Sequence, residues 1–276
     1  MVELAQHYYL DNFLRLCDTV EERYADILSP DEQQVLDCFR SLSFAAQCLY
    51  VRLVSRTGPW FRESKLDYPE IGPLAEVLDE LLETDMIEQA EELDAQDLGQ
   101  LFTRPELQAA FSGHLGKRRL DGKAALLDAI EALGLNTDEM LEILEEAEPD
   151  RIVAPLYAEV IELLQLLFFG NRYQSLTEFV LEDLGITRYF PYSLQREERK
   201  FENREALEEY LQCAALADSH YELLELESPE DLPTLARKVK RFKVTYESST
   251  NRYHRLCNNL ARDLERLEEL DLALAL

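Results

Sequence analysis

A carboxylate pattern that could support metal-dependent phosphodiester hydrolysis is present in the sequence. Pro149-Asp150 is followed at a distance by Glu198-Arg199-Lys200, and carboxylates of this kind can hold a divalent ion that activates water and stabilises a phosphoryl transition state. They must lie on adjacent strands of a sheet, whereas Asp150 is expected between helices and Glu198 within a charged helical run. With 56 acidic residues in the chain, such matches arise by chance. We therefore predict no catalytic residue and no metal ligand in this chain.

The histidines and cysteines form no recognisable catalytic or metal-binding arrangement. The four histidines are isolated from one another, and His254 and Cys257 share a helical face without the second pair that a zinc site requires. The five cysteines lack a CxxC pair and mostly fall in apolar helical patterns, which predicts reduced core thiols in a cytoplasmic protein. The longest apolar run, residues 160–169, contains Glu162 and is too short to cross a bilayer, so we expect no membrane partner.

Basic side chains are gathered in three stretches, although the whole chain has a formal net charge of −28. A strongly acidic protein is on average repelled by DNA, so DNA binding would require the bases to share one face. The third stretch, residues 237–255, contains seven basic residues and one acidic residue. The predicted DNA-binding residues lie in these stretches: Arg52, Arg56, Arg62 and Lys65; Lys117, Arg118, Arg119 and Lys123; and Arg237, Lys238, Lys240, Arg241 and Lys243.

The first basic stretch surrounds Trp60, the only tryptophan of the chain. Basic side chains beside an exposed aromatic ring suit a nucleic-acid backbone with a stacked base. Large aromatic side chains are more often buried, however, and the charges would then be a solvated rim. Because Pro59 and Phe61 flank Trp60 and make an apolar cluster, we favour a role for Trp60 as a core anchor over base stacking.

The elements that must position this stretch resemble a winged-helix module over residues 1–93. Apolar residues at helical spacing predict helices ending near residue 28, over 31–42 and from 44 to about 56. Trp60–Leu66 reads as a short strand, residues 73–83 as a helix and Met86–Ala90 as a second strand. We expect these two strands to pair as the one short β-ribbon of an otherwise all-α, multi-module chain.

Residues 94–135 have the pattern of a SAP-type DNA-binding module. A helix from Pro105 to about Phe111 ends at Ser112-Gly113, and a second helix begins near Gly122 with Lys123 in its first turn. The N-terminus of a helix exposes free N–H groups and a partial positive charge, so it can hold phosphate. The alternative is an ordinary helical hairpin with a solvated basic loop.

Helical patterns continue to the last residue. Residues 136–230 predict a helical linker domain, with two helices over 137–169 split near Pro149 and Pro155 and further helices at 176–184, 203–216 and 219–227. Residues 231–276 predict two amphipathic helices, and the last has the alternation of small and large residues typical of a tetratricopeptide helix. One such unit cannot bury its own apolar face, so we interpret it as the start of a truncated repeat array.

Four long segments resemble the Fanconi-associated nuclease family, structure-specific DNA-repair nucleases with a VRR-type catalytic domain. They are YYLDNFLRLCDTVEERYADILSPDE near the start, YVRLVSRTGPWFRESKLDYPEI from Tyr50, LFFGNRYQSLTEFVLEDLGITRYFPY from Leu167 and LARDLERLEELDLALAL at the end. The resemblance implies an N-terminal fragment, from a bacterial protein, without the C-terminal nuclease domain. It also implies that Mg²⁺ or Mn²⁺ binds in that missing domain, and that flap or branched double-stranded DNA is a partner in interstrand crosslink repair.

Three functional hypotheses follow from the sequence. The first is a DNA-binding and scaffold portion of a 5′-flap nuclease that reads DNA shape and phosphates and does not cut DNA by itself. The second is a helical protein-interaction scaffold whose charge excludes nucleic acid. The third is an acidic DNA mimic. The first requires the three basic stretches to lie on one continuous face.

Overall fold

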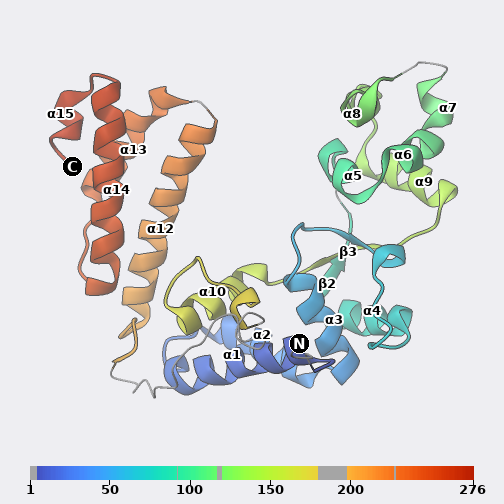
Figure 1. Cartoon of the computed structure of the whole chain (residues 1–276), viewed down its shortest axis with the longest axis horizontal. Coiled ribbons are helices and arrows are strands. Elements are labelled where there is room, and N and C mark those ends of the chain that lie inside the picture. The colour runs from blue at the N-terminus through green and yellow to red at the C-terminus, as the bar shows by residue number, and fades with distance from the viewer. Residues whose placement is uncertain (1–4, 92, 117–119, 180–197, 227) are drawn as a thin grey trace. The chain divides into compact units, whose positions relative to one another are not determined.

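The computed structural model describes residues 5–91, 93–116, 120–179, 198–226 and 228–276. The chain divides into two compact units, one formed by Met1–Glu21 with Ser29–Phe190 and the other by Glu22–Leu28 with Pro191–Leu276. Helices dominate both units (Figure 1), which confirms the predicted, mainly helical fold class. Among the described residues, no helix combines the length and the apolar content needed to cross a membrane.

Three helices open the chain: α1 (Tyr8–Tyr24), α2 (Pro30–Ser41) and α3 (Phe44–Val54). A capping box starts α2, because the Glu32 N–H donates to the Ser29 hydroxyl at 3.2 Å and the Ser29 N–H donates to the Glu32 carboxylate at 2.7 Å. The Tyr50 side chain of α3 is fully buried, and its hydroxyl donates to the Leu156 carbonyl at 2.7 Å. These helices therefore pack against a segment that lies about a hundred residues later in the sequence.

A three-stranded antiparallel sheet joins segments that are far apart in the sequence. Both β1 (Phe61–Arg62) and β2 (Ile87–Gln89) pair with β3 (Ile152–Pro155), in the order β1-β3-β2. The register places Phe61 opposite Val153 and Glu88 opposite Ala154. The predicted direct pairing of Trp60–Leu66 with Met86–Ala90 is therefore wrong, because β3 lies between the two strands. The first strand is also shorter than predicted, since Glu63–Lys65 form a 3₁₀ turn.

The central strand β3 lies in the predicted break near Pro149 and Pro155 between two helices, where no strand was expected. Two helices are present over residues 137–169, α9 (Thr137–Ala147) and α10 (Ala158–Phe169), and β3 lies between them. Its residues Ile152, Val153 and Ala154 are buried. The strand exists because β1 and β2 supply hydrogen-bond partners from much earlier in the chain, and helical periodicity in the sequence carries no signal of that long-range pairing.

The helices between β2 and β3 form a second apolar core within the first unit. α4 (Leu74–Glu83) precedes β2, and α5 (Ala95–Leu101), α6 (Arg104–Ala110), α7 (Ser112–Leu115), α8 (Gly122–Glu131) and α9 follow it. The fully buried members of this core are Leu98, Leu107, Phe111, Leu126 and Ile130. α6 and α8 lie where the two helices of the hairpin were predicted, and α7 begins at Ser112, where a break was expected.

α5 packs closely on α8 at a glycine in the middle of α5. A Cβ atom added at Gly99 would lie 2.7 Å from Leu127 Cδ1. The Lys123 ammonium also donates to the Gly99 carbonyl. The lack of a side chain at Gly99 thus leaves room for Leu127 of α8 beside the backbone of α5.

The described part of the second unit contains four α-helices: α12 (Arg204–Glu225), α13 (Leu232–Arg241), α14 (Glu247–Arg266) and α15 (Leu270–Ala273). A 3₁₀ turn, Pro229–Asp231, precedes α13. The two helices predicted over 203–227 are a single helix, α12, because the sequence there contains no Gly or Pro to end the first one. The predicted helix at 176–184 lies largely outside the described residues.

Candidate nucleic-acid interface

α13 presents a row of basic side chains on the face opposite its apolar core. Leu232, Leu235, Ala236 and Val239 are buried, as expected for one face of a helix with 3.6 residues per turn. The exposed cations are Arg237, Lys238, Lys240 and Arg241 on the other face and Lys243 just after the helix. None of these five makes an ion pair within the described residues. We call these five residues the α13 basic face.

Packing within the second unit holds this face in place. The Tyr253 hydroxyl of α14 donates to the Val239 carbonyl at 3.2 Å, and the Phe242 N–H donates to the same carbonyl at 3.0 Å. Lys238, Lys240 and Arg241 lie in the last turn, where the helix dipole favours positive charge. In a chain of net charge −28, a row of cations without carboxylate partners is a place where a polyanion such as a phosphate backbone meets little repulsion.

Arg52 and Arg56 lie within a group of aromatic rings in the first unit. The Arg52 guanidinium carbon is 3.8 Å from the Tyr9 ring centroid, and Arg52 also pairs with Glu70 at 3.0 Å. Arg56 is exposed, donates to the Tyr68 hydroxyl at 3.0 Å and lies over Phe61. The Arg52 guanidinium is therefore largely occupied by contacts within the protein. Arg56, in contrast, has an exposed guanidinium that can contact a phosphate.

Arg62 is buried in an ionic network, with only 2% of its surface exposed. Its Nε donates to Asp150 at 2.7 Å and its Nη1 donates to Glu106 at 2.9 Å, while its guanidinium lies 4.1 Å over the Phe102 ring. The backbone N–H of Thr103, the Arg62 guanidinium and the Lys65 ammonium hold the pKa of Glu106 well below its usual range. We therefore assign Arg62 to the core, where it joins β1 to α6 and to the segment before β3.

The remaining predicted residues differ in accessibility. Lys65 is exposed and lies 3.2 Å from Glu106, so its charge is partly compensated. Lys123 uses its ammonium to bind the Gly99 carbonyl and is half-buried. Lys117, Arg118 and Arg119 lie outside the described residues. Among the predicted groups whose residues the structure describes, only the α13 basic face is brought together as a set of exposed cations.

Trp60 packs against the second apolar core of the first unit. It is half-buried and contacts the cluster that contains Leu98, Leu107 and Ile152. This position supports the anchor role, because the indole covers the core from the β1 side.

Replacing Trp60 with alanine is expected to lower the free energy of unfolding by about 2–3 kcal/mol, somewhat less than for a fully buried aromatic ring. Binding of DNA should then weaken only as far as the chain unfolds. Thermal melting and DNA binding of the same variant test this role. A variant that melts like the unmodified chain and selectively loses flap binding would show that Trp60 stacks on a base.

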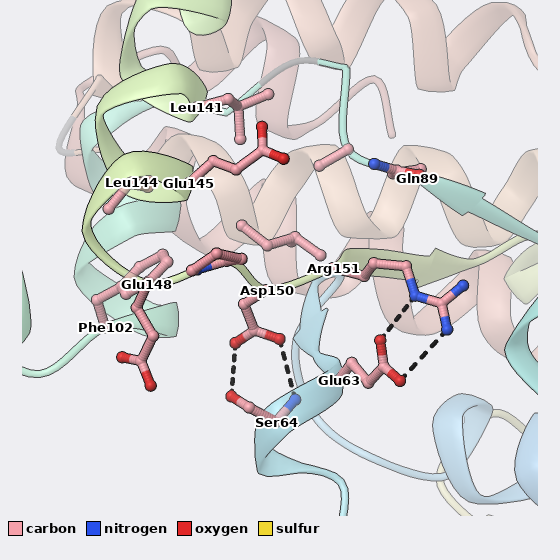
Figure 2. A pocket seen from close by; sticks show the side chains of 13 residues that line it. Glu63, Ser64, Gln89, Phe102, Leu141, Leu144, Glu145, Glu148, Asp150 and Arg151 are labelled. Carbon is pink, nitrogen blue, oxygen red and sulfur yellow. Dashed lines mark hydrogen bonds and ion pairs between the residues drawn. The ribbon is translucent and has the colours of Figure 1, made fainter. Parts of the chain in front are cut away.

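The described pocket of the first unit is acidic and lies beside the sheet. It has a volume of about 570 Å³ and is lined by α9, by residues of the segment before β3 and by Gln89 of β2. Figure 2 shows Arg151 facing Glu63, and Asp150 facing Ser64. The Asp150 carboxylate accepts from the Ser64 N–H at 3.0 Å and from the Ser64 hydroxyl at 2.5 Å, besides its bond to Arg62.

The position of Asp150 corrects one premise of the sequence analysis. Asp150 lies two residues before β3, so the expectation that no strand lies near it is wrong. Both of its carboxylate oxygens nevertheless accept hydrogen bonds from protein donors, and its side chain is 4% exposed. A carboxylate engaged in this way is poorly placed to hold a catalytic metal ion. Among the described residues, no cluster of His, Cys, Asp and Glu has the geometry of a metal site.

Sequence reasoning missed the acidic partners of Arg62. Glu106 is recognisable as the fourth residue of the capping box Thr103-Arg104-Pro105-Glu106, but nothing in that pattern indicates a contact with β1. Asp150 is visible only as part of a Pro-Asp pair. The contacts depend on the pairing of β1 with β3, and that pairing has no local signal.

Residues 7–88 match the protein family described as "FAN1, HTH domain". The chain is 36% identical over 205 residues to the Fanconi-associated nuclease 1 homolog of Pseudomonas aeruginosa, which covers 74% of this chain and 36% of that protein. It is 31% identical over 231 residues to the Fanconi-associated nuclease 1 homolog of Arabidopsis thaliana, which covers 80% of this chain and 26% of that protein. The chain thus spans about a quarter to a third of the length of these relatives.

A solved structure shares the fold. The crystal structure of paFAN1 bound to a 2-nucleotide 5′-flap DNA with a gap superposes with a TM-score of 0.84 and 29% sequence identity, over 99% of this chain and 48% of that one. A second crystal structure of paFAN1, bound to a 1-nucleotide 5′-flap DNA with a gap, superposes with a TM-score of 0.73. The sequence matches and the shared fold agree, and the chain belongs to the Fanconi-associated nuclease family, with the helix–turn–helix domain of that family at residues 7–88.

Proposed function

We propose that this chain is a DNA-binding portion of a structure-specific nuclease that acts on 5′-flap DNA. The observation that carries the proposal is the α13 basic face, whose five exposed cations make no ion pair within the described residues. Neighbouring structures of paFAN1 hold 5′-flap DNA, which supports the choice of ligand. Cations on one helix face contact phosphates and read no bases, so we expect recognition of DNA shape with little sequence preference.

The repair role is a further part of the proposal. We infer that the whole protein acts in interstrand crosslink repair, in the cytoplasm of a bacterial cell and on its nucleoid DNA. Catalysis with Mg²⁺ or Mn²⁺ would belong to a nuclease domain that these 276 residues do not supply. The exposed Arg56 and the basic residues Lys117, Arg118, Arg119 and Lys123 are proposed as additional phosphate contacts.

The purified chain is expected not to cut flap DNA, because Asp150 is bound by Arg62 and Ser64. A gel assay with Mg²⁺ or Mn²⁺ and 5′-flap DNA measures this directly. Cleavage that survives stringent purification and disappears in Asp150→Asn or Glu198→Gln would show that the carboxylate pattern is catalytic after all.

Photocrosslinking tests the DNA contact itself. A benzophenone side chain introduced at Lys240 should crosslink to 5′-flap DNA, because Lys240 is exposed on the α13 basic face. The same group introduced at Glu222, an exposed acidic position of α12, is the matched control and should crosslink much less. Equal yields at the two positions, or no crosslink at Lys240, would contradict the proposal.

A protein-interaction scaffold remains the second candidate function. The observation that favours it is a set of exposed apolar side chains at the ends of helices in the second unit, Tyr221, Leu224, Leu226, Leu270 and Leu274. Exposed apolar groups of this kind are common at protein interfaces. A chain that fails to bind DNA at low salt would favour this function.

A further inference from the structure

The acidic pocket borders β2, an outer strand of the three-stranded sheet. β2 is an edge strand, since the order is β1-β3-β2. The Ala90 N–H donates to the Ile152 carbonyl at 2.9 Å, and the Leu156 N–H donates to the Met86 carbonyl at 3.0 Å. In an antiparallel pair every second residue bonds to the same neighbour, so the backbone groups of Gln89 face away from β3. Gln89 is also exposed and lines the pocket.

Some of the carboxylates that line the pocket are paired with arginines, and others remain available to a ligand. Glu63 is bound by Arg151 at 2.7 Å, and Asp150 is bound by Arg62 at 2.7 Å. Glu145 makes no ion pair or hydrogen bond within the described residues. Its carboxylate extends from α9 on the side of the pocket that also holds Leu141 (Figure 2).

Glu148 is the second carboxylate of the pocket that can still accept hydrogen bonds from a ligand. Its Oε2 lies 3.6 Å from Arg62 Nη2, which is within ion-pair range but beyond hydrogen-bond distance. The same Nη2 atom is buried and has no hydrogen-bond partner in the described part of the chain. The pocket wall therefore contains a carboxylate, Glu148, that is incompletely bonded, and the buried Arg62 guanidinium lies behind it.

Apolar side chains complete the lining of the pocket. They include Ala90, Phe102, Leu141, Leu144 and Ile152. Such a wall accommodates the aliphatic stem of a long basic side chain, whose charged end can then reach a carboxylate. Arginine fits better than lysine, because its planar guanidinium binds a carboxylate through two hydrogen bonds and is more weakly hydrated. The same negative charge disfavours a phosphate backbone.

We propose that this pocket and the β2 edge bind an extended, arginine-bearing segment of a partner protein. The segment adds a strand beside β2 through the backbone N–H and carbonyl of Gln89, and its arginine enters the pocket toward Glu145. Addition of an extended strand to a sheet edge, with side-chain pockets giving specificity, is an established way of recognising peptides. The site is distinct from the α13 basic face and does not depend on DNA binding.

Fluorescence anisotropy with short labelled peptides tests the charge requirement. The probe is a seven-residue peptide with arginine at its centre, flanked by alternating threonine and valine, and it is compared with peptides that carry lysine or glutamate at the centre. The arginine peptide should bind most tightly and the glutamate peptide should not bind. Glu145→Lys should weaken binding of the arginine peptide by about tenfold, because it removes one ion pair and adds a repulsive charge in its place.

Matched variants separate the pocket from general charge effects. Glu146→Lys makes the same charge change on the same helix at an exposed position that does not line the pocket, and it should leave peptide binding within about twofold of the unmodified chain, because surface ion pairs contribute little. Gln89→Pro removes the outward N–H without removing a ladder bond, which proline tolerates at an edge, and should weaken binding where Gln89→Ala does not.

Several results would refute the proposed peptide site. Equal binding of the arginine and glutamate peptides, no saturable binding of either, or equal losses in Glu145→Lys and Glu146→Lys would each refute the site. If thermal melting shows that Gln89→Pro unfolds the chain, the comparison of Glu145→Lys with Glu146→Lys decides alone. Weaker flap-DNA binding in Glu145→Lys with unchanged peptide binding would also refute it. Loss of DNA binding by α13 variants leaves this proposal unaffected.

Discussion

Replacing Arg62 with methionine is expected to lower the free energy of unfolding by about 3–5 kcal/mol. The side chain is 1% exposed and pairs with Asp150, which is 4% exposed. Removing the guanidinium leaves that carboxylate buried without its cation and removes one partner of Glu106, whereas the apolar volume is largely kept by methionine. Urea denaturation followed by circular dichroism measures the change.

Lys65→Met is the matched control for Arg62→Met. Lys65 contacts the same Glu106 carboxylate at 3.2 Å, but its side chain is 57% exposed. An exposed ion pair contributes about 0–1 kcal/mol, so the control should stay within that range. Adding Asp150→Asn to Arg62→Met should recover part of the loss, because the uncompensated buried charge is removed. Equal stability of Arg62→Met and Lys65→Met would contradict the assignment of Arg62 to the core.

The same network makes stability depend on pH in the acid range. The folded-state pKa of Glu106 is lowered from its ordinary value of 4.5, so the unfolded chain binds the proton more readily than the folded chain. The resulting stabilisation is present above that ordinary pKa and is lost as the pH falls toward the lowered folded value. In Arg62→Met this acid dependence should become shallower.

Replacing the five residues of the α13 basic face with glutamine is expected to cause the largest loss of DNA binding. Each lost phosphate contact should lower the magnitude of the slope of log K against log salt by roughly 0.9, or about 4.5 if all five residues contact phosphates. The five side chains are exposed and glutamine is a good helix former, so thermal melting should hardly change. Anisotropy titrations with duplex DNA at several salt concentrations give the slopes.

Single substitutions provide the control for the α13 basic face. Lys240→Gln should lower the slope by roughly 0.9. Arg266→Gln removes a cation of the same unit that already pairs with Asp263 at 2.7 Å, so its slope should match that of the unmodified chain. If both single variants change the slope equally, net charge and not the α13 basic face governs binding.

Local patterns in the sequence predict the helices and the α13 basic face. The apolar period of α13 and its cluster of cations lie within one short segment, and the same holds for the hairpin of α6 and α8. Long-range contacts are a different case. β3 forms because two distant strands offer partners, and Arg62 is a core residue because Glu106 and Asp150 meet it in space. In a sequence, a buried arginine with distant acidic partners looks the same as an exposed arginine that binds phosphate.

The central claim is that this chain binds DNA through its phosphates despite a net charge of −28. Fluorescence anisotropy of the unmodified chain with 5′-flap, nicked and intact duplex DNA across a salt series tests it most directly. The account predicts saturable binding to all three at low salt, tightest for the flap, with log K falling linearly as log salt rises. No saturable binding at low salt, or binding that salt leaves unchanged, would contradict it.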